Sequence, residues 1–84
     1  MNTLAAAKDT LELARQYYLQ DLTSDMPELD YTHLAEMVTK METTEMSPTK
    51  MSRWLGWIQA AVVSNACGRI NLDAIKQINK KWAD

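Results

Sequence analysis

The chain has almost none of the residues that cross-link a fold or hold a metal ion. Its 84 residues include one Cys, one His and no Phe. A lone Cys67 excludes a disulfide within the chain, and Cys67 with His33 cannot supply the four ligands of a structural zinc site. We therefore expect no metal, no cofactor and a reducing compartment such as the cytoplasm.

Signals for membranes, secretion and catalysis are also missing. The apolar run after Arg53 is shorter than the ~20 residues that span a bilayer, and Gln59 interrupts it. The first residues do not form a secretory signal. The chain contains no Gly-rich phosphate loop, no calcium-loop spacing and no nucleophile paired with a base. We expect a cytoplasmic protein that is not an enzyme, with no catalytic residues and no membrane contact.

What the chain does have is a surplus of helix formers. Only two Gly and two Pro occur, 46% of the residues are hydrophobic and 24% are charged. Ala, Leu, Met, Lys, Glu and Gln dominate, and no segment alternates with the period of a strand. The sequence predicts a single all-α domain, residues 1–84, folded as a compact bundle of four helices at about 4–22, 26–43, 48–67 and 72–82.

The clearest predicted helix spans residues 48–67. Ser47 is a good N-cap, Pro48 suits the first turn, and Gly68 can end the helix in the left-handed conformation. Apolar residues three and four positions apart share one face: Met51, Trp54, Leu55, Ile58, Ala61, Val62 and Ala66. We expect this helix to be central and the most buried.

Small residues form a second strip on the same helix. Ala60, Val63 and Cys67 lie beside Gly56, so that another backbone could approach closely. A chain of this length hides only ~60% of its unfolded surface, which makes an isolated monomer marginal. Both features favour a homodimer.

The predictions of the first and last helices depend on fewer sequence signals. Residues 4–22 contain an apolar seam: Leu4, Ala7, Leu11, Ala14, Tyr18 and Leu22. Residues 72–82 follow a cap at Asn71, and Ile70 and Ile75 form a hydrophobic staple around it.

The start of the second helix has two interpretations. Asp25 and Glu28 have the spacing of a capping box, with Pro27 in the first turn, for a helix from about residue 26. Asp30 can instead cap a helix that begins at Tyr31. The sequence leaves both open.

Charge is divided along the chain. Residues 1–47 carry nine acids and three bases, whereas residues 48–84 carry two acids and six bases. Opposite signs can help the two halves pack, or an acidic strip can bind a basic protein. The bases of the second half are candidate nucleic-acid contacts: Lys50, Arg53, Arg69, Lys76, Lys80 and Lys81. An isoelectric point near 5.3 argues against a dedicated nucleic-acid binder.

Residues 53–59 read Arg-Trp-Leu-Gly-Trp-Ile-Gln. This order resembles a core found in short proteins of tailed bacteriophages and prophages, which have Arg-Trp-Leu-Gly, an aromatic residue, an aliphatic residue and Gln. The chain has Ala60 next, where Gly is expected in that group. The resemblance implies a phage or prophage origin, and hence the host cytoplasm.

Together these features predict a small interaction module that docks on a host or viral protein to modulate or inhibit it. Tyr17, Arg53 and Trp57 are the candidate partner-binding residues, because aromatic and Arg side chains commonly anchor such contacts. Core packing is the competing interpretation of Trp57. Binding of nucleic acid through the basic residues is the alternative function.

Overall fold

The computed structural model describes residues 1–84 and contains four α-helices with no strand. They are α1 (Thr3–Gln16), α2 (Tyr31–Thr43), α3 (Pro48–Asn65) and α4 (Leu72–Trp82), and the short 3-10 helices η1 (Leu19–Asp21) and η2 (Pro27–Leu29) lie between α1 and α2. The predicted all-α bundle of four helices is confirmed.

The second half of the chain follows its capping signals closely. Ser47 Oγ accepts a hydrogen bond from the Lys50 N–H at 3.1 Å, and Asn71 Oδ1 accepts one from Ala74 at 3.1 Å. α4 has the predicted bounds, and Ile70 and Ile75 are both buried. α3 ends at Asn65 rather than residue 67, because Cys67 already has the left-handed φ of 50° that precedes Gly68 at 89°.

The first helix is shorter than predicted. It ends at Gln16, since Tyr18 adopts a left-handed conformation with φ 58°, and the chain turns into η1 there. Tyr18 and Leu22 therefore leave the expected apolar seam and are 77% and 45% exposed. Leu19 takes the buried position instead.

The second helix begins at Tyr31, so that a start near residue 26 is wrong. Residues 27–29 form η2, and Asp30 occupies the N-cap position of α2. The Asp30 carboxylate does not cap α2. It accepts hydrogen bonds from the Ser24 N–H and hydroxyl, both at 2.9 Å, and so closes the connection between the 3-10 helices.

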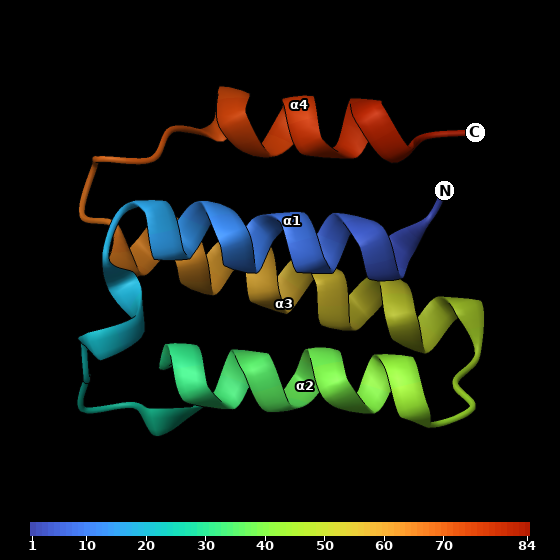
Figure 1. Ribbon diagram of the computed structural model, residues 1–84, viewed down its shortest axis with the longest axis horizontal. Coiled ribbons are helices and arrows are strands. Elements are labelled where there is room, and N and C mark those ends of the chain that lie inside the picture. The colour runs from blue at the N-terminus through green and yellow to red at the C-terminus, as the bar shows by residue number, and fades with distance from the viewer.

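Helix packing places two helices in the middle of the bundle. Figure 1 shows α1 crossing in front of α3, with α2 along one side and α4 along the other. α1 packs closely against all three other helices, whereas α3 packs closely against α1 and α2 and is hydrogen-bonded to α4 through Gln59 and Asn79. α3 supplies Ile58 and Val62 to the core, two of the five largest fully buried side chains. Helix 48–67 is thus deeply buried on one side, but it shares the expected central position with α1.

A cluster of polar side chains joins α4 to α1 and α3. Gln59 is 8% exposed and forms a reciprocal amide pair with Asn79, at 2.8 and 3.2 Å. Gln59 Nε2 also donates to the Thr10 hydroxyl at 3.3 Å, and that hydroxyl donates to the Ala6 carbonyl at 2.8 Å. We call Thr10, Gln59 and Asn79 the amide junction. Because each partner is satisfied, it stabilises one specific docking of α4.

Candidate functional site

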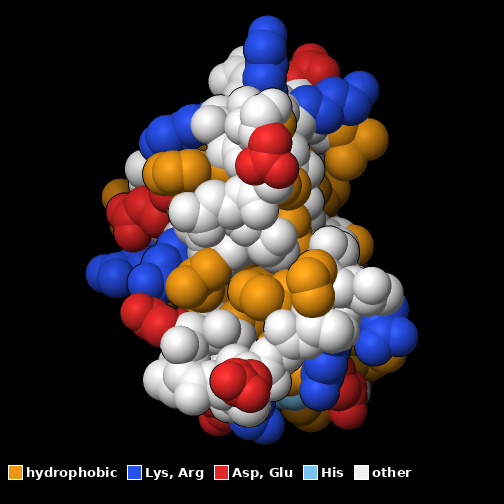
Figure 2. All heavy atoms as spheres, turned by 90° about the vertical axis from the view of Figure 1, so that its right-hand side faces the viewer, with side chains coloured by type: hydrophobic (Ala, Val, Ile, Leu, Met, Phe, Trp, Pro, Cys, Tyr) orange, Lys and Arg blue, Asp and Glu red, His pale blue; other side chains and the backbone are white.

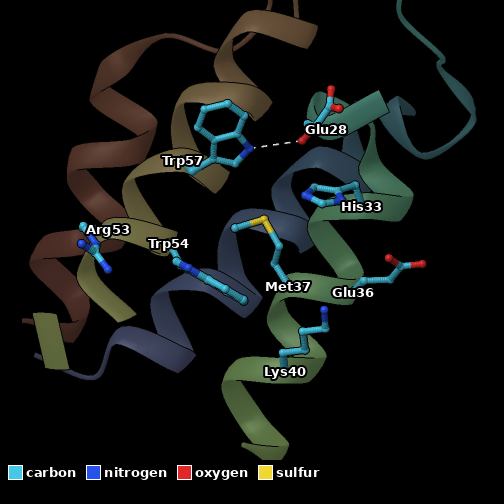
Figure 3. Close-up of a pocket in the computed structure, with 8 residues that line it drawn as sticks. All are labelled: Glu28, His33, Glu36, Met37, Lys40, Arg53, Trp54 and Trp57. Atoms are coloured by element: carbon cyan, nitrogen blue, oxygen red, sulfur yellow. Dashed lines mark hydrogen bonds between the residues drawn. The ribbon is translucent and has the colours of Figure 1, made fainter. Parts of the chain in front are cut away.

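A groove between α2 and α3 is the most distinctive feature of the surface. It has a volume of about 470 Å³ and is lined by Glu28, His33, Glu36, Met37, Lys40, Arg53, Trp54 and Trp57. Figure 3 shows both indole rings projecting from α3, Met37 projecting from α2 between them, and ionisable side chains around the rim. We call it the tryptophan groove.

The Trp57 side chain is hydrogen-bonded through its indole nitrogen, but its ring is partly exposed to solvent. Its Nε1 donates to the Glu28 carbonyl at 3.1 Å, yet 44% of the residue is exposed. Asn65, two turns further along α3, similarly donates to the Leu29 carbonyl at 2.6 Å. Trp57 is therefore not a core residue. Its indole is fixed in position beside η2 and presents an apolar surface to solvent.

Trp54 forms the floor of the same groove. It is half-buried against the core, and Lys50 Nζ lies 5.2 Å from its ring centroid in a cation–π contact. Two large, rotationally restrained aromatic side chains thus lie side by side on α3. Such side chains bury much area at low entropic cost when a partner covers them.

The charges on the rim are unpaired. The ion pairs of the chain are Lys8–Glu42 at 2.9 Å, Lys81–Asp9 at 3.4 Å and the terminal amino group with Asp84. None of them involves the rim charges, which are Glu28, Glu36, Lys40 and Arg53. Glu28 lies at the Trp57 end of the groove and Lys40 at the opposite end (Figure 3). Two charges of each sign remain available for another molecule.

Of the three predicted partner-binding residues, the structure brings two together. Arg53 and Trp57 both line the tryptophan groove. Tyr17 lies elsewhere, half-buried at the C-cap of α1, where its carbonyl accepts a hydrogen bond from Arg69 Nη1 at 3.2 Å.

Sequence reasoning missed the α2 side of the groove. His33, Glu36, Met37 and Lys40 share one face of α2 at three- and four-residue spacing, which a helical projection of the segment could have revealed. Glu28 could not have been found in this way. It reaches the groove only because side chains of α3 hold the backbone of η2.

The outward side of α3 carries no charge over a long stretch. Between Arg53 and Arg69 no residue is charged, and Gly56, Ala60, Ser64 and Cys67 are exposed. Apart from Gly56, its two chain neighbours and the nearby backbone of its own helix, nothing lies within 4 Å of the position that a Cβ on Gly56 would take. On the α4 side a second groove of about 420 Å³ is lined by Gln59, Ala60, Val63, Ser64, Leu72 and Ile75. Leu72 at its edge is 62% exposed.

The predicted nucleic-acid contacts do not form one surface with free charges. Lys50 lies over Trp54, the Arg69 guanidinium donates to the Ala66 and Tyr17 carbonyls, and Lys81 pairs with Asp9. Lys76 and Lys80 on α4 and Arg53 on α3 make no ion pair. Figure 2 shows acidic and basic side chains interleaved on the end of the molecule that carries both termini. The Lys81–Asp9 pair joins a basic residue of the second half of the sequence to an acidic residue of the first.

The structure offers no cluster of three or more His, Cys, Asp or Glu side chains that could hold a metal ion. None of its helices combines the length and the apolarity needed to cross a membrane. Cys67 is exposed, two residues beyond the end of α3.

Fold and groove together define a small four-helix protein with an open aromatic groove on one face. Comparison of the chain with protein-family models, with curated proteins and with solved structures finds no match.

Proposed function

We propose that the protein is a non-enzymatic interaction module, encoded by a phage or prophage, that docks on a host or viral protein through the tryptophan groove. It acts in the host cytoplasm and modulates or inhibits the protein that it binds. The phage origin rests on the resemblance of residues 53–59 alone. The docking role rests on the geometry of the groove.

The observation that carries the proposal is the state of Trp57. A fixed indole with an open ring, next to a second Trp and an unpaired Arg53, is the composition typical of binding hot spots. The apolar floor with a charged rim also matches the anatomy of protein interfaces.

The test is capture of a partner by the immobilised chain, compared among variants. The native chain should retain one protein from a host lysate, and Trp57→Ala and Arg53→Ala should lose it while their circular dichroism remains helical. Tyr18→Ala is the matched control, because Tyr18 is the most exposed aromatic residue and does not line the groove. Capture that survives Trp57→Ala would contradict the proposal.

Binding of nucleic acid is the second candidate. It is favoured only by Lys76 and Lys80, which lie one turn apart on α4 and are exposed without an ion pair. Phosphate contacts through them would weaken steeply with salt. A gel shift at low ionic strength that Lys76→Ala with Lys80→Ala abolishes would support this candidate, and the absence of any shift would reject it.

A further inference from the structure

Three uncovered features lie side by side on one surface of the molecule. They are the tryptophan groove, the uncharged outward side of α3, and the apolar groove beside Leu72. We call this surface the α3 face. In Figure 1 α3 lies behind α1 between α2 and α4, so its outward side belongs to a broad face of about 30 by 25 Å.

We propose that the α3 face packs against the same face of a second copy of this chain when no other partner is present. The two copies are related by a twofold axis that crosses α3 at right angles near Gly56, so that the two α3 helices run antiparallel. The inference deepens the proposed function and rests on it in one respect. The tryptophan groove, which docks the host or viral protein, is part of the face that forms the dimer. A host or viral partner must then displace the second copy.

The charges of the rim are self-complementary about such an axis. Glu28 and Lys40 lie on the same wall of the tryptophan groove, at its opposite ends, and neither has an ion partner within the chain. A twofold rotation exchanges the two ends. It therefore places Glu28 of each copy beside the partner's Lys40, and the pair forms twice, as an isologous contact requires.

The centre of the face suits a close, charge-free contact. Gly56 lies near the midpoint of α3 and has open space where a Cβ would be, so two helices can cross there at short distance. The neighbouring Ala60 is small, exposed and uncharged. Depletion of charge at the core of a contact and its restriction to the rim are features of homodimer interfaces.

Burial of Trp57 and Leu72 would also offset the weakness of a short chain. The monomer leaves 44% of Trp57 and 62% of Leu72 exposed to water. A domain of this length has little core to spare, and association is a common way to hide further apolar area. A second copy supplies such an area without any change in the fold.

The experiment is a measurement of mass in solution by light scattering across a range of concentrations. The native chain should approach twice 9.6 kDa. Ala60→Glu should remain at 9.6 kDa, because it places a charge at the centre of the contact. Gln77→Glu is the matched control, since it adds the same charge on the α1–α4 side, and it should dimerise like the native chain.

Charge reversal then tests the orientation. Glu28→Lys and Lys40→Glu should each raise the dissociation constant about tenfold or more, because each leaves like charges opposed twice. A mixture of the two variants, and the double variant in one chain, should both recover native dimerisation. Both residues are exposed and outside ion pairs, so circular dichroism should not change.

Each outcome bears on the proposal. A native mass of 9.6 kDa at the highest soluble concentration overturns it, as does a dimer that Ala60→Glu leaves intact. A dimer without rescue in the mixture overturns the antiparallel arrangement. If the chain is a monomer and still captures a protein through Trp57, the dimer is overturned and the proposed function stands. If the chain is a dimer and Trp57→Ala does not affect capture, the proposed function is overturned and the dimer stands.

Discussion

The polar groups on the two flanks of α3 differ in whether they have partners within the chain. On the α4 flank Gln59 satisfies Asn79 and Thr10, and every member of the amide junction has its partner inside the chain. On the α2 flank Glu28, Glu36, Lys40 and Arg53 surround the tryptophan groove without a single ion pair.

This difference separates polar groups that stabilise the fold, on the α4 flank, from charged groups that remain available for binding, on the α2 flank. A buried amide that lost its partners would cost free energy, so the junction fixes α4 in one place. Exposed charges cost little when water solvates them, and they contribute to recognition only when a partner arrives. The two flanks should therefore respond differently to substitution: the first in stability, the second in binding.

The largest effect should follow loss of Gln59. Gln59→Ala removes three hydrogen bonds and opens a cavity beside Thr10, and we expect a loss of about 2–4 kcal/mol in the free energy of unfolding. Urea denaturation followed by circular dichroism measures it. A double-mutant cycle with Asn79→Ala should show a coupling of about 1 kcal/mol. A cost under about 1 kcal/mol would mean that the junction is not structural.

The next effect concerns the contact between α1 and the end of α4. Asp9 Oδ2 accepts from Trp82 Nε1 at 2.7 Å and lies 3.4 Å from Lys81 Nζ. Asp9→Ala should cost about 1–2 kcal/mol, because the indole N–H loses a charged acceptor. Lys81→Ala should cost about 0.5 kcal/mol or less, since the Lys81–Asp9 pair is solvated. Equal costs in urea denaturation would mean that the ion pair dominates.

Trp57→Ala should have a smaller effect on stability and a large one on binding. The half-exposed ring and its single hydrogen bond to the Glu28 carbonyl are worth about 1 kcal/mol to the fold. Trp57→Phe keeps an apolar ring but loses the N–H, so it should retain part of the partner capture. Denaturation and capture measured on the same preparations check both. A stability loss above about 3 kcal/mol would place Trp57 in the core.

Neutralisation of the rim should have the smallest effect on the fold. Glu36→Gln and Lys40→Gln should each change the free energy of unfolding by less than about 0.5 kcal/mol, because neither charge is paired in the chain. Lys8→Gln, which breaks the Lys8–Glu42 pair, is the matched comparison. If Lys40→Gln proved the more costly of the two Lys variants, the contrast between the flanks would fail.

The sequence predicted the fold best where capping residues mark helix ends. Ser47, Pro48 and Asn71 located the starts of α3 and α4, because capping is a local interaction. The end of α1 could not be predicted, since Tyr18 takes a left-handed conformation that nothing in its own type favours.

The candidate site was predictable only in part, because its walls meet through tertiary packing. Arg53 and Trp57 were selected because Arg and aromatic side chains commonly anchor contacts, and both line the groove. Glu28 arrives from a segment 29 positions earlier, held by the Trp57 indole. Gln59 interrupts the apolar run of α3, and its burial depends on Asn79 and Thr10, which lie 20 and 49 positions away.

The hydrogen bond from the Trp57 indole to the Glu28 carbonyl links the tryptophan groove to the connection that precedes α2. A ligand that rotates the ring would break this bond and leave the Asn65–Leu29 bond as the one side-chain hydrogen bond from α3 to η2. Binding of a ligand in the groove would then speed up protease cleavage within residues 22–30. Such a readout would detect engagement before any partner has been identified.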